Sequence, residues 1–414
     1  MNNLSKPLPR VLQGTLEQAL KRFPVVVLTG ARQTGKSTLI QRLLDPNREY
    51  HTLDDLDVLE RAQKEPAALL RSGKPMTLDE VQRSPELLLA VKREVDKNRQ
   101  AGRFLLSGSA NLALMSKVTE SLAGRAVYLA LHPFTLSEKE GQGGAGRWEE
   151  LLDNPSKAAK GYKSSKSIKI NDLFTGGFPP VSLEKDRSTC RAWLEGYIQT
   201  YLERDLRALS AVSDLADFRR LMRLAALRSG KVINQNELAR DSGLKQPTVH
   251  RYLNLLETSY IIQRIPAYAV NRSNRVIKTP KLYYADTALA AVVAGIHTAE
   301  ELEKANMTGH LWETLVVNDL MVWRETADPK PEILHWRTKQ NEEVDFVVER
   351  DGKVIPIEVK SADRVKIDDV KHIQKFFKEY GKSVPHGLAL YNGSKAEEIA
   401  DRIWAVPFGL ALGL

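Results

Sequence analysis

The chain has 414 residues, a formal net charge of +9, 42% hydrophobic residues and a single cysteine. This length predicts about two to four domains, while the composition excludes a disordered chain and the absence of long apolar runs excludes a membrane protein. Because Cys190 stands alone, an internal disulfide framework and a cysteine-built zinc site are excluded, and a reducing, cytoplasmic location is expected. The positive charge favours a polyanionic partner, with ribosomal contact or simple solubility left open.

Residue patterns predict five regions along the chain. Residues 24–131 alternate β-rich runs with helical patterns, which indicates an α/β layer with a mostly parallel sheet inside a first domain at 1–140. Residues 141–171 begin glycine-rich and end lysine-rich, which is typical of a mobile basic linker. The remaining regions are a helical region at 172–230, a helix-turn-helix with a wing at 231–285, and a last α/β domain at 286–414.

A glycine-bearing loop lies between an apolar strand and a helix in VVVLTGARQTGKSTLIQRLL. It matches G-x-x-x-x-G-K-(S/T), and the flanking strand and helix make the match specific. The backbone N–H groups of such a loop point at phosphate oxygens, its lysine reaches the β- and γ-phosphates, and its serine is a ligand of Mg²⁺. The residues predicted to bind ATP are Gly30, Ala31, Gln33, Thr34, Gly35, Lys36, Ser37 and Thr38, with Ser37 also binding Mg²⁺.

Two acidic residues follow the apolar run PMTL, where a second strand is expected to end. Asp79 is predicted to hold Mg²⁺, directly or through water, and Glu80 to act as the general base on an attacking water. The next strand-like run ends with Ser107 and Ser109, which would sense the γ-phosphate or else simply cap a helix.

Arg125 lies between a helical stretch and a strand, at the edge of the α/β layer. An arginine at such an edge reaches the nucleotide of a neighbouring subunit and stabilises transition-state charge, which predicts a homo-oligomer. A surface or structural arginine is the alternative.

The stretch NQNELARDSGLKQPTVHRYLNLLE has the pattern of a helix-turn-helix, and the basic segment after it has the pattern of a wing. Such a unit places its second helix against DNA, so DNA is the expected partner; a protein-interaction platform is the alternative. The side chains predicted to contact phosphates or base edges are Lys245, Gln246, Thr248, His250, Arg251, Arg272 and Arg275.

Residues 343–360, EVDFVVERDGKVIPIEVK, predict a β-hairpin with a two-residue type I′ turn at Asp351-Gly352. In that register Phe346 faces Ile357, and Asp345 faces Glu358. Like charges placed opposite each other on a sheet repel, so something in the rest of the chain must compensate for this pair.

The arrangement D…E-x-K suits a magnesium-dependent nuclease. Asp345 and Glu358 would bind Mg²⁺, while Lys360 would stabilise developing charge or orient water. Glu313, in the helical segment GHLWETLVVNDL, would add a third carboxylate. The alternative is a solvated face whose acids are offset by Lys360, with Glu343 opposite that lysine.

Taken together, the chain resembles a widespread bacterial and archaeal family of AAA-like P-loop ATPases. The resemblance covers nearly the whole chain and is carried by GARQTGKST, LDEVQ, SGSANL, LAGRA, GGFP, YLERDL, the helix-turn-helix stretch, KLYYADTALA, GHLWETLVVNDL, EVDFVV and IEVK. Two departures are the long insertion at 141–170 and Lys245, which stands where a serine or threonine would cap the recognition helix.

The resemblance implies an α/β fold class with four parts: an AAA-type ATPase domain, a helical lid, a winged helix-turn-helix, and a C-terminal domain similar to PD-(D/E)xK nucleases. It implies ATP and Mg²⁺ as cofactors and an ATPase that couples nucleotide state to DNA remodelling or processing. An ATP-licensed metal-dependent nuclease and a nucleotide-controlled protein-interaction switch remain as alternatives.

Overall fold

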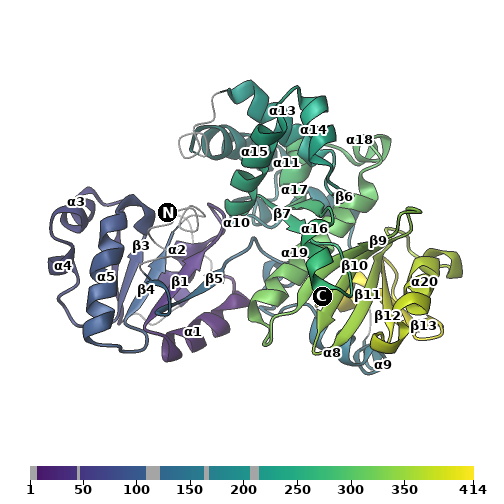
Figure 1. Cartoon of the computed structure of the whole chain (residues 1–414), viewed down its shortest axis with the longest axis horizontal. Coiled ribbons are helices and arrows are strands. Elements are labelled where there is room, and N and C mark those ends of the chain that lie inside the picture. Colours follow the sequence, from purple (N-terminus) through teal and green to yellow (C-terminus); the bar gives the residue numbers. More distant parts are fainter. Residues whose placement is uncertain (1–6, 44–46, 109–121, 163–166, 206–213) are drawn as a thin grey trace. The chain divides into compact units, whose positions relative to one another are not determined.

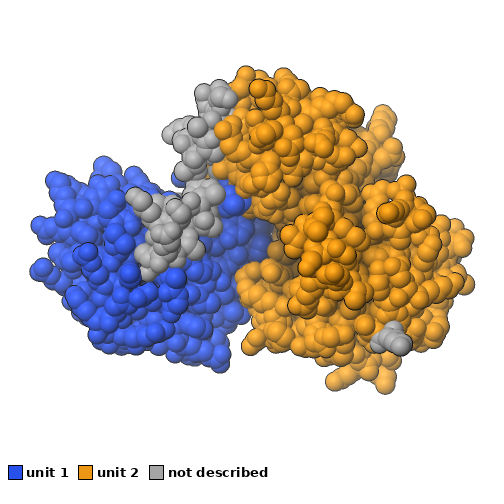
Figure 2. Space-filling model, in the orientation of Figure 1, with its two compact units in different colours: residues 1–133, 258–260 blue, residues 134–257, 261–414 orange. Residues whose placement is uncertain are grey.

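The computed structural model describes residues 7–43, 47–108, 122–162, 167–205 and 214–414, which form two compact units (Figure 2). Unit 1 comprises residues 1–133 and 258–260, and unit 2 comprises residues 134–257 and 261–414. Unit 2 thus begins at residue 134, and the predicted domain bounds stay predictions. Among the described residues, no helix has both the length and the apolar composition needed to cross a membrane.

Unit 1 is a parallel five-stranded sheet in the order β2-β3-β4-β1-β5, which confirms the predicted α/β layer. Its strands are β1 (Val25–Thr29), β2 (Glu49–Thr52), β3 (Met76–Asp79), β4 (Phe104–Ser107) and β5 (Ala126–Ala130). Its helices are α1 (Leu12–Arg22), α2 (Lys36–Leu43), α3 (Leu56–Lys64), α4 (Pro66–Leu69) and α5 (Pro85–Lys97), and the 3₁₀ turn η1 (Val81–Arg83) follows β3.

Strand β1 is apolar at nearly every position because it is covered on both faces. Val25 and Val27 pack in one core with residues of α3, α4 and α5, while Val26 and Leu28 pack in a second core with α1 and α2. Alternate side chains of a strand point to opposite faces, so a central parallel strand reads as a continuous hydrophobic run. Because β1, β3 and β4 run parallel, their carboxyl ends lie at one edge of this sheet (Figure 1).

The first half of unit 2 is mainly helical. It contains α7 (Leu136–Lys139), α8 (Trp148–Asp153), α9 (Pro155–Ala159), η3 (Ile170–Phe174), α10 (Pro179–Ser182), α11 (Arg187–Tyr197), the π-helical segment η4 (Ile198–Asp205) and α13 (Leu215–Ala226). Next come β6 (Lys231–Val232), α14 (Gln235–Ser242), α15 (Gln246–Thr258), β7 (Ile262–Ile265), α16 (Arg272–Ile277) and β8 (Lys281–Tyr284). The three strands form an antiparallel sheet in the order β6-β8-β7.

The prediction of a mobile linker over 141–171 is wrong for residues 148–159. Helices α8 and α9 bury Trp148, Leu151 and Ala158, and the Trp148 indole donates a hydrogen bond to Asp319 Oδ1 at 2.6 Å. The glycines and lysines dominate the composition here, whereas a few apolar side chains at helical spacing decide the packing.

The second half of unit 2 is a mixed six-stranded sheet in the order β13-β14-β12-β11-β10-β9. Its strands are β9 (Glu332–Arg337), β10 (Glu343–Arg350), β11 (Lys353–Val359), β12 (Gly387–Tyr391), β13 (Glu397–Ala400) and β14 (Ile403–Pro407). Its helices and 3₁₀ turns are α17 (Thr287–Ala294), α18 (Ala299–Lys304), α19 (Thr308–Thr326), η5 (Ile367–Val370), α20 (Lys371–Tyr380), η6 (Gly381–Ser383) and α21 (Phe408–Ala411). Strands β11, β12 and β14 are parallel, and the others pair antiparallel.

The predicted hairpin forms, and the predicted register is present at the five pairs nearest the turn; the predicted pair of Asp345 with Glu358 is not among them. Arg350 pairs with Lys353 and Phe346 pairs with Ile357, and both turn residues have positive φ, 51° for Asp351 and 75° for Gly352. Both faces of the hairpin are covered: Val347 and Val354 share a core with Phe376 of α20, while the Phe346 ring lies 5.5 Å from that of Tyr283. The apolar residues on both faces follow from this double burial.

Candidate functional site

The loop between β1 and α2 has a backbone that glycine makes possible. Gly30 has a φ of 144°, and a Cβ there would lie 2.3 Å from the Leu131 carbonyl oxygen, so a side chain is excluded. Gly35 has a φ of 92°, and Gln33 adopts a φ of 66° between them. Positive φ values at these positions let the loop turn tightly ahead of the α2 N-terminus, as a phosphate-binding loop requires.

Lys36 lies folded back on this loop. Its Nζ donates hydrogen bonds to the carbonyl oxygens of Gly30 at 3.0 Å and Ala31 at 2.8 Å, and the residue is only 6% exposed. Burial lowers the pKa of Lys36 to about 8, with Glu80 and Asp79 opposing that shift. The Lys36 ammonium thus donates its hydrogen bonds to neutral carbonyl oxygens. A phosphate oxygen can replace these carbonyls as the acceptor.

Asp79, at the end of β3, is the centre of a hydrogen-bond network. Its Oδ2 accepts from Ser37 Oγ at 2.9 Å and from the Tyr50 hydroxyl at 2.7 Å, and its Oδ1 accepts from Ser107 Oγ. The predicted residues Ser37, Asp79 and Ser107 are therefore brought together. Tyr50 was missed, because nothing in the strand sequence EYHT marks it.

Glu80 adopts a left-handed backbone conformation, with φ 58°, directly after the strand. Such a conformation is costly for a residue with a side chain and is found at functional sites. The Glu80 carboxylate accepts a hydrogen bond from Gln82, and burial raises the pKa of Glu80. Ser109, the other predicted sensor, lies outside the described residues.

Arg10 braces the loop from outside the motif. Its guanidinium donates to the carbonyl oxygen of Thr34 at 2.8 Å and to that of His132 at 2.6 Å, and the residue is buried. The Thr34 hydroxyl in turn donates to the Ala31 carbonyl at 2.9 Å, so this side chain serves the loop itself. Gln33 and Thr38 are exposed at the loop and helix start. No sequence signal links Arg10 to a loop more than twenty residues away.

Arg125 makes a bidentate ion pair with Asp96 near the end of α5. Its Nε lies 2.5 Å from Oδ1 and its Nη2 lies 3.0 Å from Oδ2. Before it could reach another subunit's nucleotide, the guanidinium would have to leave this carboxylate. A role for Arg125 in a homo-oligomer stays a prediction.

The residues predicted to contact DNA fall into two groups. Lys245, Gln246, His250 and Arg251 are exposed at and after the start of α15, with Thr248 half-buried among them. Arg275 is only 7% exposed and its guanidinium is paired with Glu332 and Glu349. Its predicted DNA contact is therefore wrong for this structure, because acids far along the chain neutralise it. Arg272 is exposed, yet its Nη2 lies 3.2 Å from Glu349 Oε1.

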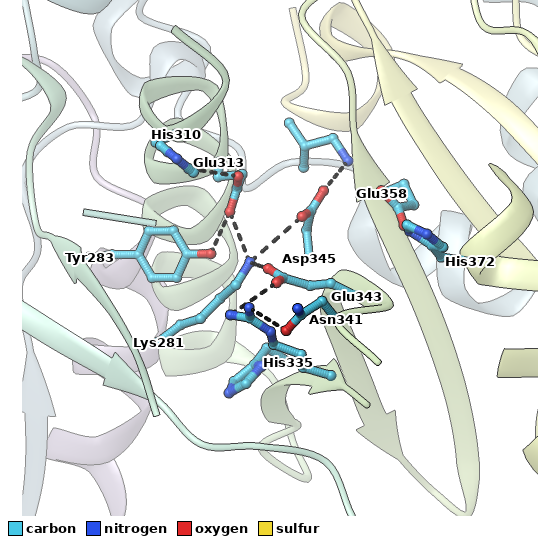
Figure 3. A network of polar contacts seen from close by, with 12 residues as sticks. Lys281, Tyr283, His310, Glu313, His335, Asn341, Glu343, Asp345, Glu358 and His372 are labelled. Carbon is cyan, nitrogen blue, oxygen red and sulfur yellow. Dashed lines mark hydrogen bonds and ion pairs between the residues drawn. The ribbon is translucent and has the colours of Figure 1, made fainter. Parts of the chain in front are cut away.

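A buried ionic cluster surrounds the carboxylates of the hairpin (Figure 3). Lys281, at the start of β8, is 1% exposed; its Nζ lies 3.2 Å from Glu313 Oε2 and 3.6 Å from Asp345 Oδ1, and it also contacts Glu343. These carboxylates, Glu313 above all, hold the pKa of Lys281 well above its ordinary value although burial alone would lower it. In the sequence Lys281 is the last basic residue of the predicted wing, and nothing in the motif KLYYADTALA links it to the carboxylates of the hairpin.

Glu313 is held by several donors. The Tyr283 hydroxyl donates to Glu313 Oε2 at 2.7 Å, and His310 Nδ1 lies 3.3 Å from Oε1. Burial would raise the pKa of Glu313, but Lys281 and His310 outweigh it and lower that pKa to about 2. Glu313 is thus an ionised carboxylate in a buried place.

The other predicted metal ligands lie beyond the last hydrogen-bonded pair of the hairpin. Asp345 Oδ2 accepts the Val359 backbone N–H at 2.8 Å, and Glu358 Oε2 accepts from Lys360 Nζ at 2.9 Å. Burial and Glu313 raise the pKa of Asp345 to about 6, and burial together with Asp345 raises the pKa of Glu358 well above its ordinary value. Glu358 lies apart from Lys281, on the side of His372 (Figure 3).

The described side chains do not fit a magnesium site as they stand. Mg²⁺ needs oxygen ligands at about 2.0–2.1 Å in octahedral array. An ammonium group already lies among the acids, and within the described residues no group of three or more His, Cys, Asp or Glu side chains is arranged to hold a metal ion. Metal binding by Glu313, Asp345 and Glu358 stays a prediction.

Two curated proteins resemble this chain over most of its length. The uncharacterized protein Rv2008c of Mycobacterium tuberculosis and the uncharacterized protein Mb2031c of Mycobacterium bovis are each 32% identical over 347 residues, covering 83% of this chain and 72% of theirs. The chain belongs to their family.

Three family models match successive parts of this family member. The model described as an AAA domain matches residues 22–139, which places the P-loop, Asp79 and Glu80 inside an AAA-like P-loop ATPase domain. Two domains of unknown function, DUF8612 and DUF4143, match residues 170–300 and 308–411. The winged-helix and nuclease-like assignments therefore stay predictions.

Among solved structures, the Walker-type ATPase of Pyrococcus abyssi resembles the chain at 17% identity, covering 68% of this chain and 94% of its own, with a TM-score of 0.44. A score this low supports no inference about this chain.

Proposed function

We propose that the chain binds and hydrolyses ATP and couples its nucleotide state to the engagement of DNA. The observation that carries the ATPase part is the convergence of Lys36, Ser37 and Asp79 beside Glu80 at one end of the parallel sheet. In P-loop ATPases these residue types hold the phosphates, the metal ion and the attacking water.

The loop residues fit magnesium and nucleotide. Ser37 Oγ and Asp79 Oδ2 lie 2.9 Å apart, and hydroxyl and carboxylate oxygens are the ligands that Mg²⁺ prefers. Ser37 and Asp79 would hold the ion, which when bound supplies positive charge to the β- and γ-phosphates. Lys36 would exchange the carbonyls of Gly30 and Ala31 for phosphate oxygens.

Glu80 is proposed as the general base. Its raised pKa brings the carboxylate closer to the range in which it can take a proton from water and release it again, and Gln82 orients it. Replacing the carboxylate by an amide removes the base and keeps the size of the side chain.

Glu80→Gln tests this role. Turnover of ATP is expected to fall by about 10²–10⁴-fold while binding of a fluorescent ATP analogue is kept. Glu86→Gln, which changes an exposed acid on α5, is the matched control, and Lys36→Ala is expected to lose binding as well. Normal hydrolysis by Glu80→Gln would remove Glu80 from the mechanism.

The DNA part rests on residues 231–285, which we propose to be a winged helix. Helices α14 and α15 are joined through Gly243 in the left-handed conformation and are followed by the antiparallel strands β7 and β8, with β6 beside β8. Lys245 is exposed just before α15, and His250 and Arg251 are exposed on α15, the position of a recognition helix.

Charge reversal on α15 tests DNA engagement. Lys245→Glu and Arg251→Glu are each expected to weaken binding to duplex DNA and to lower the dependence of log K on log salt by about one unit per lost phosphate contact. Lys378→Glu, an exposed lysine on α20, is the matched control. Equal binding by all variants would favour a protein-interaction switch instead.

A further inference from the structure

Lys281 brings together two parts of unit 2. It begins β8 of the three-stranded sheet, while Glu313 belongs to α19, and Glu343 and Asp345 belong to β10 of the six-stranded sheet. Figure 3 shows its ammonium pointing into the space between these three carboxylates. The side chain is 1% exposed, so the charge has been taken out of water completely.

A buried lysine is retained only when its charge is compensated. Three carboxylates are more than one ammonium requires, and Arg337 supplies a second positive charge, with Nη1 at 3.7 Å from Glu343 Oε2. Lys281 and Arg337 thus offset two of the three negative charges without any added ion.

The distances are those of an ammonium group rather than a metal centre. Nζ lies 3.2 Å from Glu313 and 3.6 Å from Asp345. The 3.2 Å contact with Glu313 is a hydrogen bond and the 3.6 Å contact with Asp345 is an ion pair, whereas Mg²⁺ draws its oxygen ligands to about 2.0–2.1 Å. A metal ion and the ammonium would repel each other if both occupied this space.

Both carboxylate oxygens of Asp345 already face a positive or hydrogen-bonding group. Its Oδ1 faces Lys281 and its Oδ2 accepts the Val359 N–H. Glu358 Oε2 is bound by Lys360; Glu358 Oε1 makes no hydrogen bond within the described residues, but His372 Nδ1 lies 3.8 Å from it.

We propose that Lys281 is the resident cation of this acidic cluster and occupies the position that a divalent metal ion would take between Glu313, Glu343 and Asp345. The C-terminal domain then does its work without metal chemistry, and the same lysine ties the three-stranded sheet to the six-stranded one. That DNA is held but not cut is a consequence that rests on the proposed function. The inference that the acidic cluster holds no metal ion does not depend on that function.

The test is a Mn²⁺ titration of the full-length protein in the absence of nucleotide and DNA. Electron paramagnetic resonance measures how much Mn²⁺ is bound at each step of the titration. Wild type and Asp345→Asn are expected to bind Mn²⁺ equally. Lys281→Gln is expected to gain one site, at least about tenfold tighter than any in the wild type, and Lys281→Gln combined with Asp345→Asn is expected to lose it. Lys360→Gln is the matched control and is expected to gain none.

Two results would overturn the proposal: a Mn²⁺ ion bound by the wild type and lost in Asp345→Asn, or a folded Lys281→Gln protein that gains no site. Circular dichroism establishes folding of each variant. If Lys281→Gln does not fold, the comparison of wild type with Asp345→Asn still decides. Because no nucleotide or DNA is present, failure of the proposed ATPase or DNA function leaves this result unaffected.

Discussion

Lys36 in unit 1 and Lys281 in unit 2 are both buried, yet their pKa values shift in opposite directions. Burial lowers that of Lys36 to about 8, since its closest partners are the neutral carbonyls of Gly30 and Ala31. Contact with Glu313, Asp345 and Glu343 raises that of Lys281. The difference shows that nearby negative charge, rather than the degree of burial, decides the pKa of a buried lysine. The ammonium of Lys36 can exchange its neutral carbonyl partners for phosphate oxygens, whereas that of Lys281 is held by ion pairs.

Replacing each lysine separately should change the free energy of unfolding by very different amounts, and this is the largest effect we expect. Lys281→Met leaves three carboxylates without their cation and is expected to lower the free energy of unfolding of unit 2 by about 3–5 kcal/mol. Lys36→Met removes a charge that burial disfavours, so stability is expected to stay within about 0.5 kcal/mol or to rise.

Tryptophan fluorescence during urea unfolding measures this difference, because all six tryptophans, at 148, 193, 312, 323, 336 and 404, lie in unit 2. Circular dichroism reports both units and follows Lys36→Met. Equal, small effects of the two substitutions would mean that the carboxylates around Lys281 do not depend on its charge.

Asp319 is a buried acid with no cation among its contacts in the described part of the chain, and its burial makes the stability of the protein depend on pH. Burial raises the pKa of Asp319 to about 7, while the Trp148 indole opposes the shift and Glu138 adds to it. Between its ordinary pKa of 3.8 and about pH 7 the folded state keeps a proton that the unfolded state has lost, so stability falls as pH rises toward 7 and then levels off. From pH 5 to pH 8 the loss is about 2–3 kcal/mol.

Asp319→Asn should remove that loss. Relative to the wild type, the variant is expected to gain about 2–3 kcal/mol of stability between pH 5 and pH 8, measured by urea unfolding at each pH. Taking the difference between the two proteins cancels the titration of other groups, such as His335. A difference that does not change with pH would show that Asp319 is already ionised in the folded protein at pH 5.

Tyr50→Phe has the smallest expected effect. It tests how much a neutral hydroxyl donor contributes to positioning the Asp79 carboxylate. Losing the 2.7 Å hydrogen bond to Asp79 Oδ2 should cost about 1 kcal/mol and lower ATP turnover by about three- to tenfold. Tyr128→Phe, on β5 of the same sheet, is the matched control. Steady-state turnover unchanged in Tyr50→Phe would mean that Ser37 and Ser107 suffice to hold Asp79.

Local patterns predicted the elements whose partners lie close by in sequence. The register from Phe346↔Ile357 to Arg350↔Lys353 and the positive φ at Asp351 follow from the Asp-Gly turn, which fixes both strands at once. The P-loop follows similarly, since its glycines, lysine and serine lie within eight residues. The helices at 148–159 were not predicted because the segment is rich in glycine and lysine, which hides the helical spacing of its few apolar residues.

The charges of the predicted wing and metal site depended on residues far away in the chain. Arg275 is neutralised by Glu332 and Glu349, and the acids near the hairpin are neutralised by Lys281. Neither pairing has a sequence signature, because sheet and helix packing alone bring these side chains within ion-pair distance.

The sequence by itself determined the parallel α/β layer, the nucleotide loop with Asp79 and Glu80 after β3, and the hairpin that carries Asp345. Only the tertiary structure decided what those charged groups face: carbonyls and hydroxyls around Lys36 and Asp79, and a buried ammonium among Glu313, Glu343 and Asp345. The physical reason is that strand and turn preferences act over a few residues, whereas desolvation and Coulomb attraction act between any groups that folding brings together.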